Sequence, residues 1–173
     1  MFFSEGRPLF MTTVRKEIIT LEFYKPEYSE KLEYYHLSKE QKKYTALPSE
    51  ALLACERDKE RYPVVILYNQ TPVGFFVLHE GKGVEPYSEN THAVLLRAYS
   101  IHEHLQGRGI AKTSIKLLPL FVKENFPDKN EIILAVNHLN KAAQHVYQAG
   151  GFKDHGVRSM GMNGEQFIFQ MKL

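Results

Sequence analysis

The chain has 173 residues, a formal net charge of +2 and a single cysteine, and 43% of its residues are hydrophobic while 24% are charged. This composition is typical of one globular domain and excludes a disordered chain. One cysteine cannot form an internal disulfide, so Cys55 is interpreted as a buried, inert thiol. No dense stripe of Lys and Arg is present, which argues against a dedicated nucleic-acid binder.

The N-terminal segment has no clear targeting signal. No stretch of the chain approaches the ~18 apolar residues of a membrane span, and residues 1–10 lack the cleavage-site pattern of a signal peptide. We therefore expect a cytoplasmic protein with no membrane and no nucleic-acid partner. Residues 1–17 are predicted to be a partly ordered N-terminal extension, and residues 18–173 are predicted to form a single domain.

The first half of the domain is predicted to begin with a strand over residues 18–24. Pro26 favours the first turn of a helix that continues over residues 27–37. Ser38 to Gln41 has the form of a capping box, which predicts a restarted helix. A third helix, capped by Ser49, is expected to reach about Arg61.

Strands dominate the middle of the chain. Residues 64–68 are all apolar, which predicts a buried central strand, and residues 73–79 are expected to pair with it across a turn at residues 69–72. Residues 81–90 are predicted to be a loop, and residues 92–101 a long strand.

The last third alternates helices and strands. A helix is predicted over residues 110–125, with a kink or early end at Pro119. A buried strand over 131–136 and a helix over 141–149 follow, and Asn163-Gly164 predicts a closing hairpin. This order of elements predicts a mixed α/β fold. Its central sheet is mostly antiparallel, has about seven strands and about four flanking helices, and contains one βαβ crossover within residues 92–136.

The turn after the long strand is the most informative segment. In Gln106 to Ala111, Gly107 and Gly109 let the backbone approach a ligand closely, and the following helix begins with free N–H groups. With the positive charge of Arg108 and Lys112, this turn predicts a phosphate or pyrophosphate site. Neither the Walker A pattern nor the complete Rossmann fingerprint is present. A glycine-rich connection that binds nothing is the alternative at this stage.

This hexapeptide resembles the [Gln/Arg]-x-x-Gly-x-[Gly/Ala] signature of the Gcn5-related N-acetyltransferase (GNAT) family, which binds the pyrophosphate of acetyl-CoA. Ile101 stands where that family usually has Val or Ile on its fourth strand. Residues 137–152 resemble a second block of the family, in which Asn140-x-x-Ala143 leads to Tyr147 and then to Gly151-Phe152. The resemblance covers roughly residues 18–173, and the predicted order of elements matches the family fold, in which the fourth and fifth strands splay apart.

The resemblance implies an acetyl-CoA-dependent N-acetyltransferase that uses no metal and forms no covalent enzyme intermediate. The acceptor would be a primary amine of a small molecule: a polyamine, an amino acid or similar. Ile101 would donate its backbone N–H to the thioester carbonyl, and Tyr147 would be the general acid. The implied cofactor-binding residues are Tyr99, Ser100, Ile101, Gln106, Gly107, Arg108, Gly109, Ile110, Ala111, Lys112, Asn137, Asn140 and Tyr147.

Three points stay open in the sequence. Tyr147 also fits a core tyrosine and Asn140 a plain helix N-cap. Many family members carry Glu or Asp where this chain has Arg97, and a guanidinium cannot act as a base at neutral pH. A base is then sought in a water chain or in side chains near the strand ends: His92, His102, Glu103 and His104. The missing carboxylate also favours an alternative function, a non-catalytic acyl-CoA-binding sensor.

The sequence also gives expectations about metal binding and about the residues that bind the acceptor. The run His102 to His104 lacks a third ligand at a recognised spacing, so no metal is expected. Aromatic and polar side chains that could line an acceptor cleft are Tyr34, Tyr35, His36, Tyr44 and Tyr87, while Glu85 and Glu89 could attract a cationic amine. Family members are often dimers, which leaves a homodimer open.

Overall fold

The computed structural model describes residues 17–173. Its seven strands form one sheet in the order β1-β2-β3-β4-β5-β7-β6. β4 and β5 run parallel, and every other neighbouring pair is antiparallel, which confirms the predicted mixed sheet. The strands are β1 (Ile19–Phe23), β2 (Arg61–Tyr68), β3 (Thr71–His79), β4 (Ala93–Ile101), β5 (Glu131–Asn137), β6 (Lys153–Gly161) and β7 (Gly164–Lys172). Apart from Glu17, the predicted extension over residues 1–17 lies outside the described residues.

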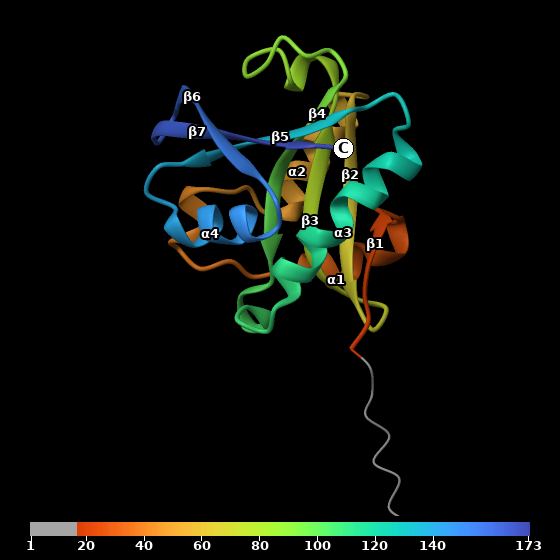
Figure 1. Cartoon of the computed structure of the whole chain (residues 1–173). Helices are drawn as coiled ribbons and strands as arrows, with labels where there is room; N and C mark the ends of the chain where they lie inside the picture. The colour runs from red at the N-terminus through yellow and green to blue at the C-terminus, as the bar shows by residue number, and fades with distance from the viewer. Residues whose placement is uncertain (1–16) are drawn as a thin grey trace, which may run out of the picture.

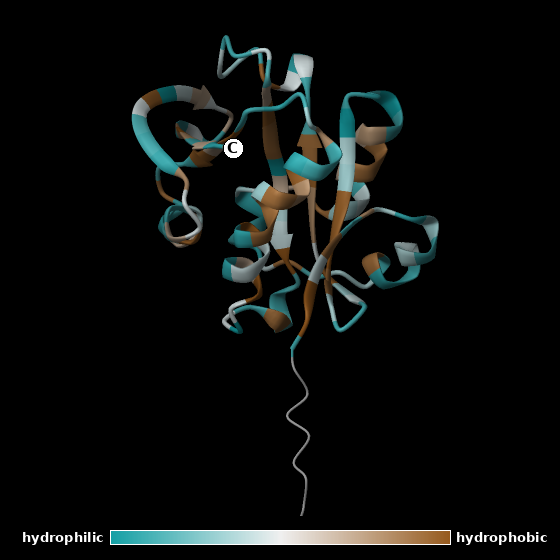
Figure 2. Ribbon diagram, turned by 45° about the vertical axis from the view of Figure 1, so that its right-hand side comes forward, coloured by the Kyte–Doolittle hydropathy of each residue, from teal (hydrophilic) through white to brown (hydrophobic). Residues whose placement is uncertain are grey.

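Two layers of helices cover the sheet. Helices α3 (Ile110–Asn125) and α4 (Lys141–Ala149) lie on one face, and α1 (Ser29–Glu33) and α2 (Pro48–Arg57) lie on the other (Figure 1). One hydrophobic cluster fills each interface, and the larger of the two lies under α3. The central strands are hydrophobic along most of their length (Figure 2), because both of their faces are covered. No helix in the described part of the chain is long and apolar enough to cross a membrane.

The first helical region is shorter than predicted. A 3₁₀ turn at Pro26–Tyr28 leads into α1, which ends at Glu33 instead of continuing through residue 37. Leu32, Tyr35 and Leu37 are each only 5% exposed. A continuous helix would turn Leu37 about 140° away from Leu32. The chain therefore leaves the helix so that all three side chains reach the core.

The capping box at Ser38 to Gln41 forms, but the predicted helix does not follow it, and the next helix has a different cap from the predicted one. Ser38 N donates to Gln41 Oε1 and Gln41 N donates to Ser38 Oγ, yet only a 3₁₀ turn at Gln41–Lys43 follows. Helix α2 begins at Pro48 with Leu47 as its N-cap, two residues before the predicted cap Ser49. It ends at Arg57, because Arg61 already belongs to β2.

The remaining elements follow the predicted order, with several local corrections. β2 begins at Arg61, before the predicted residue 64, β3 begins at Thr71 inside the predicted turn, and the predicted loop over residues 81–90 opens with a 3₁₀ turn at Gly81–Gly83. Helix α3 continues through Pro119 to Asn125, since buried residues before and after the proline hold it against the sheet. The closing hairpin turns at Met162 and Asn163, and Gly164 is the first residue of β7 with a φ of 105°. The turn is thus one residue earlier than Asn163-Gly164, and the glycine supplies the positive φ that follows it.

Candidate active site

A cavity of about 940 Å³ opens where β4 and β5 separate. The two strands pair only from Ala93 opposite Glu131 to Leu96 opposite Leu134. Beyond these pairs, β4 continues to Ile101 and β5 to Asn137 without a shared ladder. The predicted splay of the fourth and fifth strands is therefore present, and residues from both strands line the cavity.

A β-bulge in β4 determines on which face of the sheet the last side chains of this strand lie. The β3–β4 register shifts between Phe75 and Val77, and Ala98 has a φ of 52°. The extra residue breaks the alternation of the strand. Tyr99 and Ile101 consequently belong to the cluster under α3, while Ala98 packs in the cluster under α1 and α2.

The bulged strand presents backbone groups to the opening. His102 N donates to Val73 O of β3 at 2.8 Å. Because the N–H groups of an antiparallel strand alternate between its two sides, the N–H of Ile101 is directed away from β3, towards the side from which β5 has separated. Gln106 Nε2 donates to Ile101 O at 2.9 Å, so the signature motif is fastened to the end of β4.

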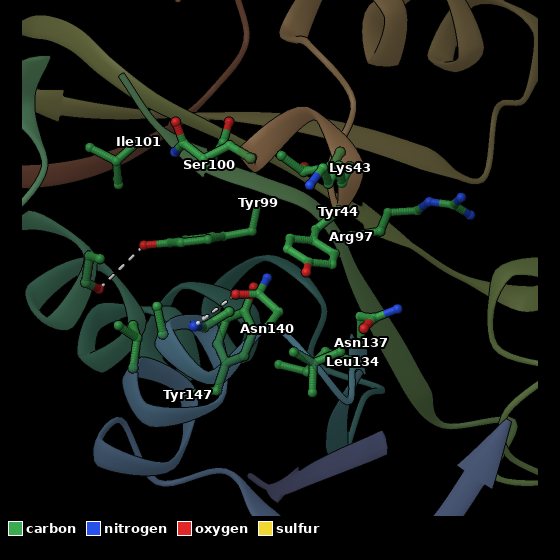
Figure 3. Close-up of a pocket in the computed structure, with 18 of the residues that line it drawn as sticks. Lys43, Tyr44, Arg97, Tyr99, Ser100, Ile101, Leu134, Asn137, Asn140 and Tyr147 are labelled. Carbon is green, nitrogen blue, oxygen red and sulfur yellow. Dashed lines mark hydrogen bonds between the residues drawn. The ribbon is translucent and has the colours of Figure 1, made fainter. Parts of the chain in front are cut away.

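Two tyrosines from different elements meet in the cavity (Figure 3). The rings of Tyr99 and Tyr147 pack edge to face with centroids 5.8 Å apart. Burial raises the pKa of both phenols above the usual range of tyrosine. The Tyr99 hydroxyl is bonded to Ser114 Oγ at 2.7 Å, whereas the Tyr147 hydroxyl has no hydrogen-bond partner among residues 17–173. Tyr147 is therefore both a core residue and a cavity residue.

The signature motif, residues 106–111, forms another part of the cavity wall. Gly107 and Gly109 have φ values of 76° and 77°, and open space lies where a Cβ would stand on either residue. Gly109 is the N-cap of α3. The cavity is lined by all of the predicted cofactor-binding residues except Arg108, which is exposed outside the lining.

The two asparagines of the second block carry structural hydrogen bonds. Asn140 Oδ1 accepts from Ala143 N, so the N-cap interpretation is confirmed. Asn137 is buried; its Nδ2 donates to Asn163 O and its Oδ1 accepts from Leu139 N. Both residues also line the cavity, so a contact with the cofactor stays a prediction for each.

Segments far apart in sequence form the end of the cavity at which we expect the acceptor, called the acceptor end below. The loop over residues 38–45 and the tip of the β6–β7 hairpin close the cavity, and Asn163 Nδ2 joins them by donating to Lys43 O at 2.5 Å. Of the aromatic candidates, Tyr44 and Tyr87 line the cavity, whereas Tyr34, Tyr35 and His36 do not. Neither Glu85 nor Glu89 lines it. Among the lining residues that the sequence pattern had not singled out are Thr45, Met160, Met162 and Gln166.

The candidate bases lie elsewhere. None of His92, His102, Glu103 and His104 lines the cavity. The one carboxylate of residues 17–173 that does is Glu40, and its ion pair with Lys43 at 2.6 Å lowers its pKa. Cys55 is half-buried, lies outside the lining, and has a pKa raised by burial.

Arg97 belongs to a polar network under the sheet. Its Nη1 lies 3.1 Å from His79 Nδ1, and His79 Nε2 lies 3.0 Å from Asp58 Oδ2 without the alignment of a hydrogen bond. Burial, followed by the charges of Arg61 and Arg97, lowers the pKa of His79. Asp58, Glu60 and His79 have ligand-type atoms within 4.8 Å of one another. Two adjacent guanidinium groups repel a cation, so this cluster does not favour a metal.

Comparisons with known proteins agree with this geometry. The model of the acetyltransferase (GNAT) family matches residues 20–152. An uncharacterized N-acetyltransferase, YbbJ, of Bacillus subtilis (strain 168) is 47% identical over 151 residues, covering 87% of this chain and 94% of YbbJ.

Solved structures share the fold at low sequence identity. Aminoglycoside acetyltransferase AAC(6')-Ib in complex with coenzyme A superposes with a TM-score of 0.72 at 14% identity, over 90% of this chain and 95% of that one. A spermidine N-acetyltransferase SpeG chimera from Vibrio cholerae and hSSAT superposes with a TM-score of 0.62 at 17% identity, over 89% and 95% of the two chains. With the family model matching most of its length, this chain belongs to the acetyltransferase (GNAT) family and is an acetyltransferase.

Proposed function

We propose that residues 18–173 form one domain that transfers the acetyl group of acetyl-CoA to a primary amine of a small molecule, by direct attack of the amine on the thioester. The observation that carries the proposal is the opening between β4 and β5. Ile101, Tyr147 and the signature motif all line the cavity at this opening, and the N–H of Ile101 is directed into the opening. Acetyl-CoA would supply the activated acetyl group. The protein would bind acetyl-CoA, polarise the thioester carbonyl and protonate the leaving thiolate.

The cofactor would bind along the line from α3 to β4. The turn from Gln106 to Lys112 offers free N–H groups, two residues without side chains, and a lysine to the pyrophosphate. The open edge of β4 at Tyr99 to Ile101 would pair with the amide groups of the pantetheine arm, as an added strand would. Asn137 and Asn140 lie on the β5 side of the same opening.

Two groups would act on the reacting atoms. The Ile101 N–H would donate to the thioester carbonyl, where negative charge develops as the amine attacks. The Tyr147 hydroxyl would protonate the departing thiolate. Burial raises the pKa of Tyr147, which keeps the phenol protonated but also makes it a weaker acid than a free tyrosine; its hydroxyl is not bonded to another side chain among the described residues.

The amine would lose its proton to water in the cavity. Arg97 replaces the carboxylate that many family members carry, and the four candidate bases lie outside the lining. Glu40, the one lining carboxylate of residues 17–173, is paired with Lys43. Cys55 also lies outside the lining, which supports attack by the amine without a covalent enzyme intermediate.

Calorimetric titration with acetyl-CoA, together with a thiol-release assay over polyamines, amino acids, aminoglycosides and peptides, tests the proposal. Binding with turnover on one class is the expected result. Binding without turnover on any class would favour the second candidate function, the non-catalytic acyl-CoA-binding sensor, which the arginine at position 97 supports. Absence of binding would overturn the cofactor site itself.

A further inference from the structure

A smaller pocket of about 260 Å³ extends the acceptor end of the main cavity beneath β4. The two spaces share lining residues, among them Tyr44, Thr45 and Tyr87, so they lie next to each other. The pocket lies on the side of α2, whose residues Ala51 and Ala54 form part of its wall. This position makes it a candidate for binding a side group of an acceptor whose amine lies in the main cavity.

The pocket contains a guanidinium group that the protein does not neutralise. Arg97 lines both spaces, and its side chain extends away from Tyr147 (Figure 3). Its one hydrogen-bond contact within residues 17–173 is with His79 Nδ1, and it forms no ion pair there. Arg97 is an exposed residue of β4, and since a guanidinium has five N–H donors, most of its donors are free to bind water or a ligand.

Neighbouring carboxylates have other partners. Asp58 is paired with Arg61 at 3.1 Å and accepts from Glu60 N at 3.0 Å. Glu50, which lines the pocket, caps α2 by accepting from Leu47 N at 2.9 Å. The second cation of the lining, Arg61, is thus compensated by Asp58, whereas Arg97 is not.

The free N–H donors of Arg97 fit one kind of ligand. A planar guanidinium matches an anionic group with several acceptor oxygens. Thr45 also lines both spaces, but its Oγ1 is buried and makes no hydrogen bond among the described residues, so this hydroxyl is not exposed to a ligand.

We propose, resting on the function proposed above, that the acceptor amine also carries an anionic oxygen group, a carboxylate or a phosphate, which Arg97 holds in the smaller pocket. A polycation without such a group would bring further positive charge to Arg97 and is disfavoured. Arg97 then selects the acceptor molecule. The proton of the attacking amine is taken by a group other than residue 97.

Matched acceptor pairs test this selection. Each pair differs in one group: amino acids against their carboxamides, and phosphoethanolamine against ethanolamine. Wild-type kcat/KM should favour the anionic member of at least one pair by about 10- to 100-fold, the value of charge-assisted hydrogen bonds. The pair that shows the preference tells a carboxylate from a phosphate. Equal use of both members in every pair, or preferred use of spermidine, would overturn the proposal.

Variants assign the preference to Arg97. Arg97→Gln should remove it while the Kd of acetyl-CoA stays the same, and Arg97→Lys should retain part of it because the charge remains without the planar fork. Arg57→Gln is the matched control, since Arg57 is exposed on α2 and lines neither space. If Arg97→Gln lowered kcat/KM equally for both members, Arg97 would not read the anion.

Equilibrium binding separates the failure of this inference from that of the proposed function. The acceptor pairs are titrated into wild type and Arg97→Gln, each saturated with CoA. An Arg97-dependent preference for the anionic member in binding, without thiol release from acetyl-CoA, would refute the proposed acetyl transfer to these amines and support the anion pocket. No preference in binding or in turnover would refute the pocket, whether or not a neutral amine is acetylated.

Discussion

The two ends of the cavity are built in different ways. Most of the proposed cofactor end comes from one continuous stretch, the end of β4, the Gln106 turn and the start of α3, whose groups are largely backbone N–H groups and glycines, and β5 and α4 add Asn137, Asn140 and Tyr147. The acceptor end is assembled from a loop before α2, the bulge of β4 and the tip of the β6–β7 hairpin. A local motif can therefore specify the cofactor, while the acceptor depends on contacts between distant segments.

The largest expected effect comes from a charge placed at the cofactor end. Gly109→Asp puts a carboxylate beside the predicted pyrophosphate site at the start of α3. Two like charges ~4 Å apart at an effective dielectric of about 20 repel by roughly 4 kcal/mol, about a thousandfold in affinity. Calorimetry should therefore detect almost no CoA binding to this variant.

Two controls separate charge from backbone strain. Gly109→Asn keeps the shape of the side chain without the charge and should retain much of the affinity. Gly156→Asp places aspartate at a similar φ of 84° in β6, outside the cavity lining, and should bind CoA as wild type does. Wild-type CoA affinity in Gly109→Asp would refute the assignment of the site.

The next effect concerns the aromatic pair between the two ends. Tyr147→Phe removes only a hydroxyl that has no partner in the described structure, so folding stability should hardly change. If that hydroxyl protonates the thiolate, kcat should fall by about 100-fold while acetyl-CoA affinity persists. Because burial raises the pKa of Tyr147, wild-type activity should show no alkaline loss from this group within the ordinary titration range of tyrosine.

Tyr99→Phe provides the contrasting variant. It removes a hydroxyl bonded to Ser114 at 2.7 Å, so it should cost about 1 kcal/mol of stability and lower kcat much less. Equal kcat losses in the two variants would mean that the Tyr147 hydroxyl does no more for the reaction than the Tyr99 hydroxyl, which would contradict its assignment as the general acid.

A smaller effect distinguishes the two roles of Asn140. Asn140→Ala removes the N-cap of α4 and should lower the free energy of unfolding by about 1 kcal/mol. Asn140→Asp retains a capping oxygen and should keep that stability. If the amide also touches the cofactor, Asn140→Asp should weaken CoA binding despite its intact cap, and unchanged affinity would leave capping as its role.

The smallest effect is a pH dependence on the acceptor side. The pKa of His79 is lowered by burial and by two arginines, so the unfolded chain takes up a proton on this side chain at a higher pH than the folded chain. Its contribution is present above the unfolded value of about 6.5 and is lost as the pH falls towards the folded value. Urea unfolding between about pH 8 and 5 should show this slope in wild type.

His79→Gln should flatten that slope, and His155→Gln, which changes an exposed histidine of β6, should leave it unchanged. The lowered pKa of Asp58 acts in a separate window, because its contribution is lost only as the pH falls below about 4. An identical slope in wild type and His79→Gln would show that the network around Arg97 does not titrate through this histidine.

The sequence by itself determined the features that depend on neighbouring residues. Period-two and apolar runs identified the strands, and Asn140 to Ala149 contained both the cap and the helix it begins. The glycines of the Gln106 turn adopt the left-handed conformations and open backbone that the motif indicated, because spacing within six residues fixes local geometry; the pyrophosphate site itself stays a prediction.

Only the tertiary structure decided the remaining features. The bulge at Ala98 reverses the alternation of β4, so Tyr99 and Ile101 lie under α3 while Arg97 reaches His79. The early end of α1 follows from burying Tyr35 and Leu37 together, which no local propensity indicates. The hydrogen bond from Asn163 to Lys43 joins residues 120 positions apart. These contacts depend on packing between elements that are remote in the chain, so local patterns could not predict the acceptor end.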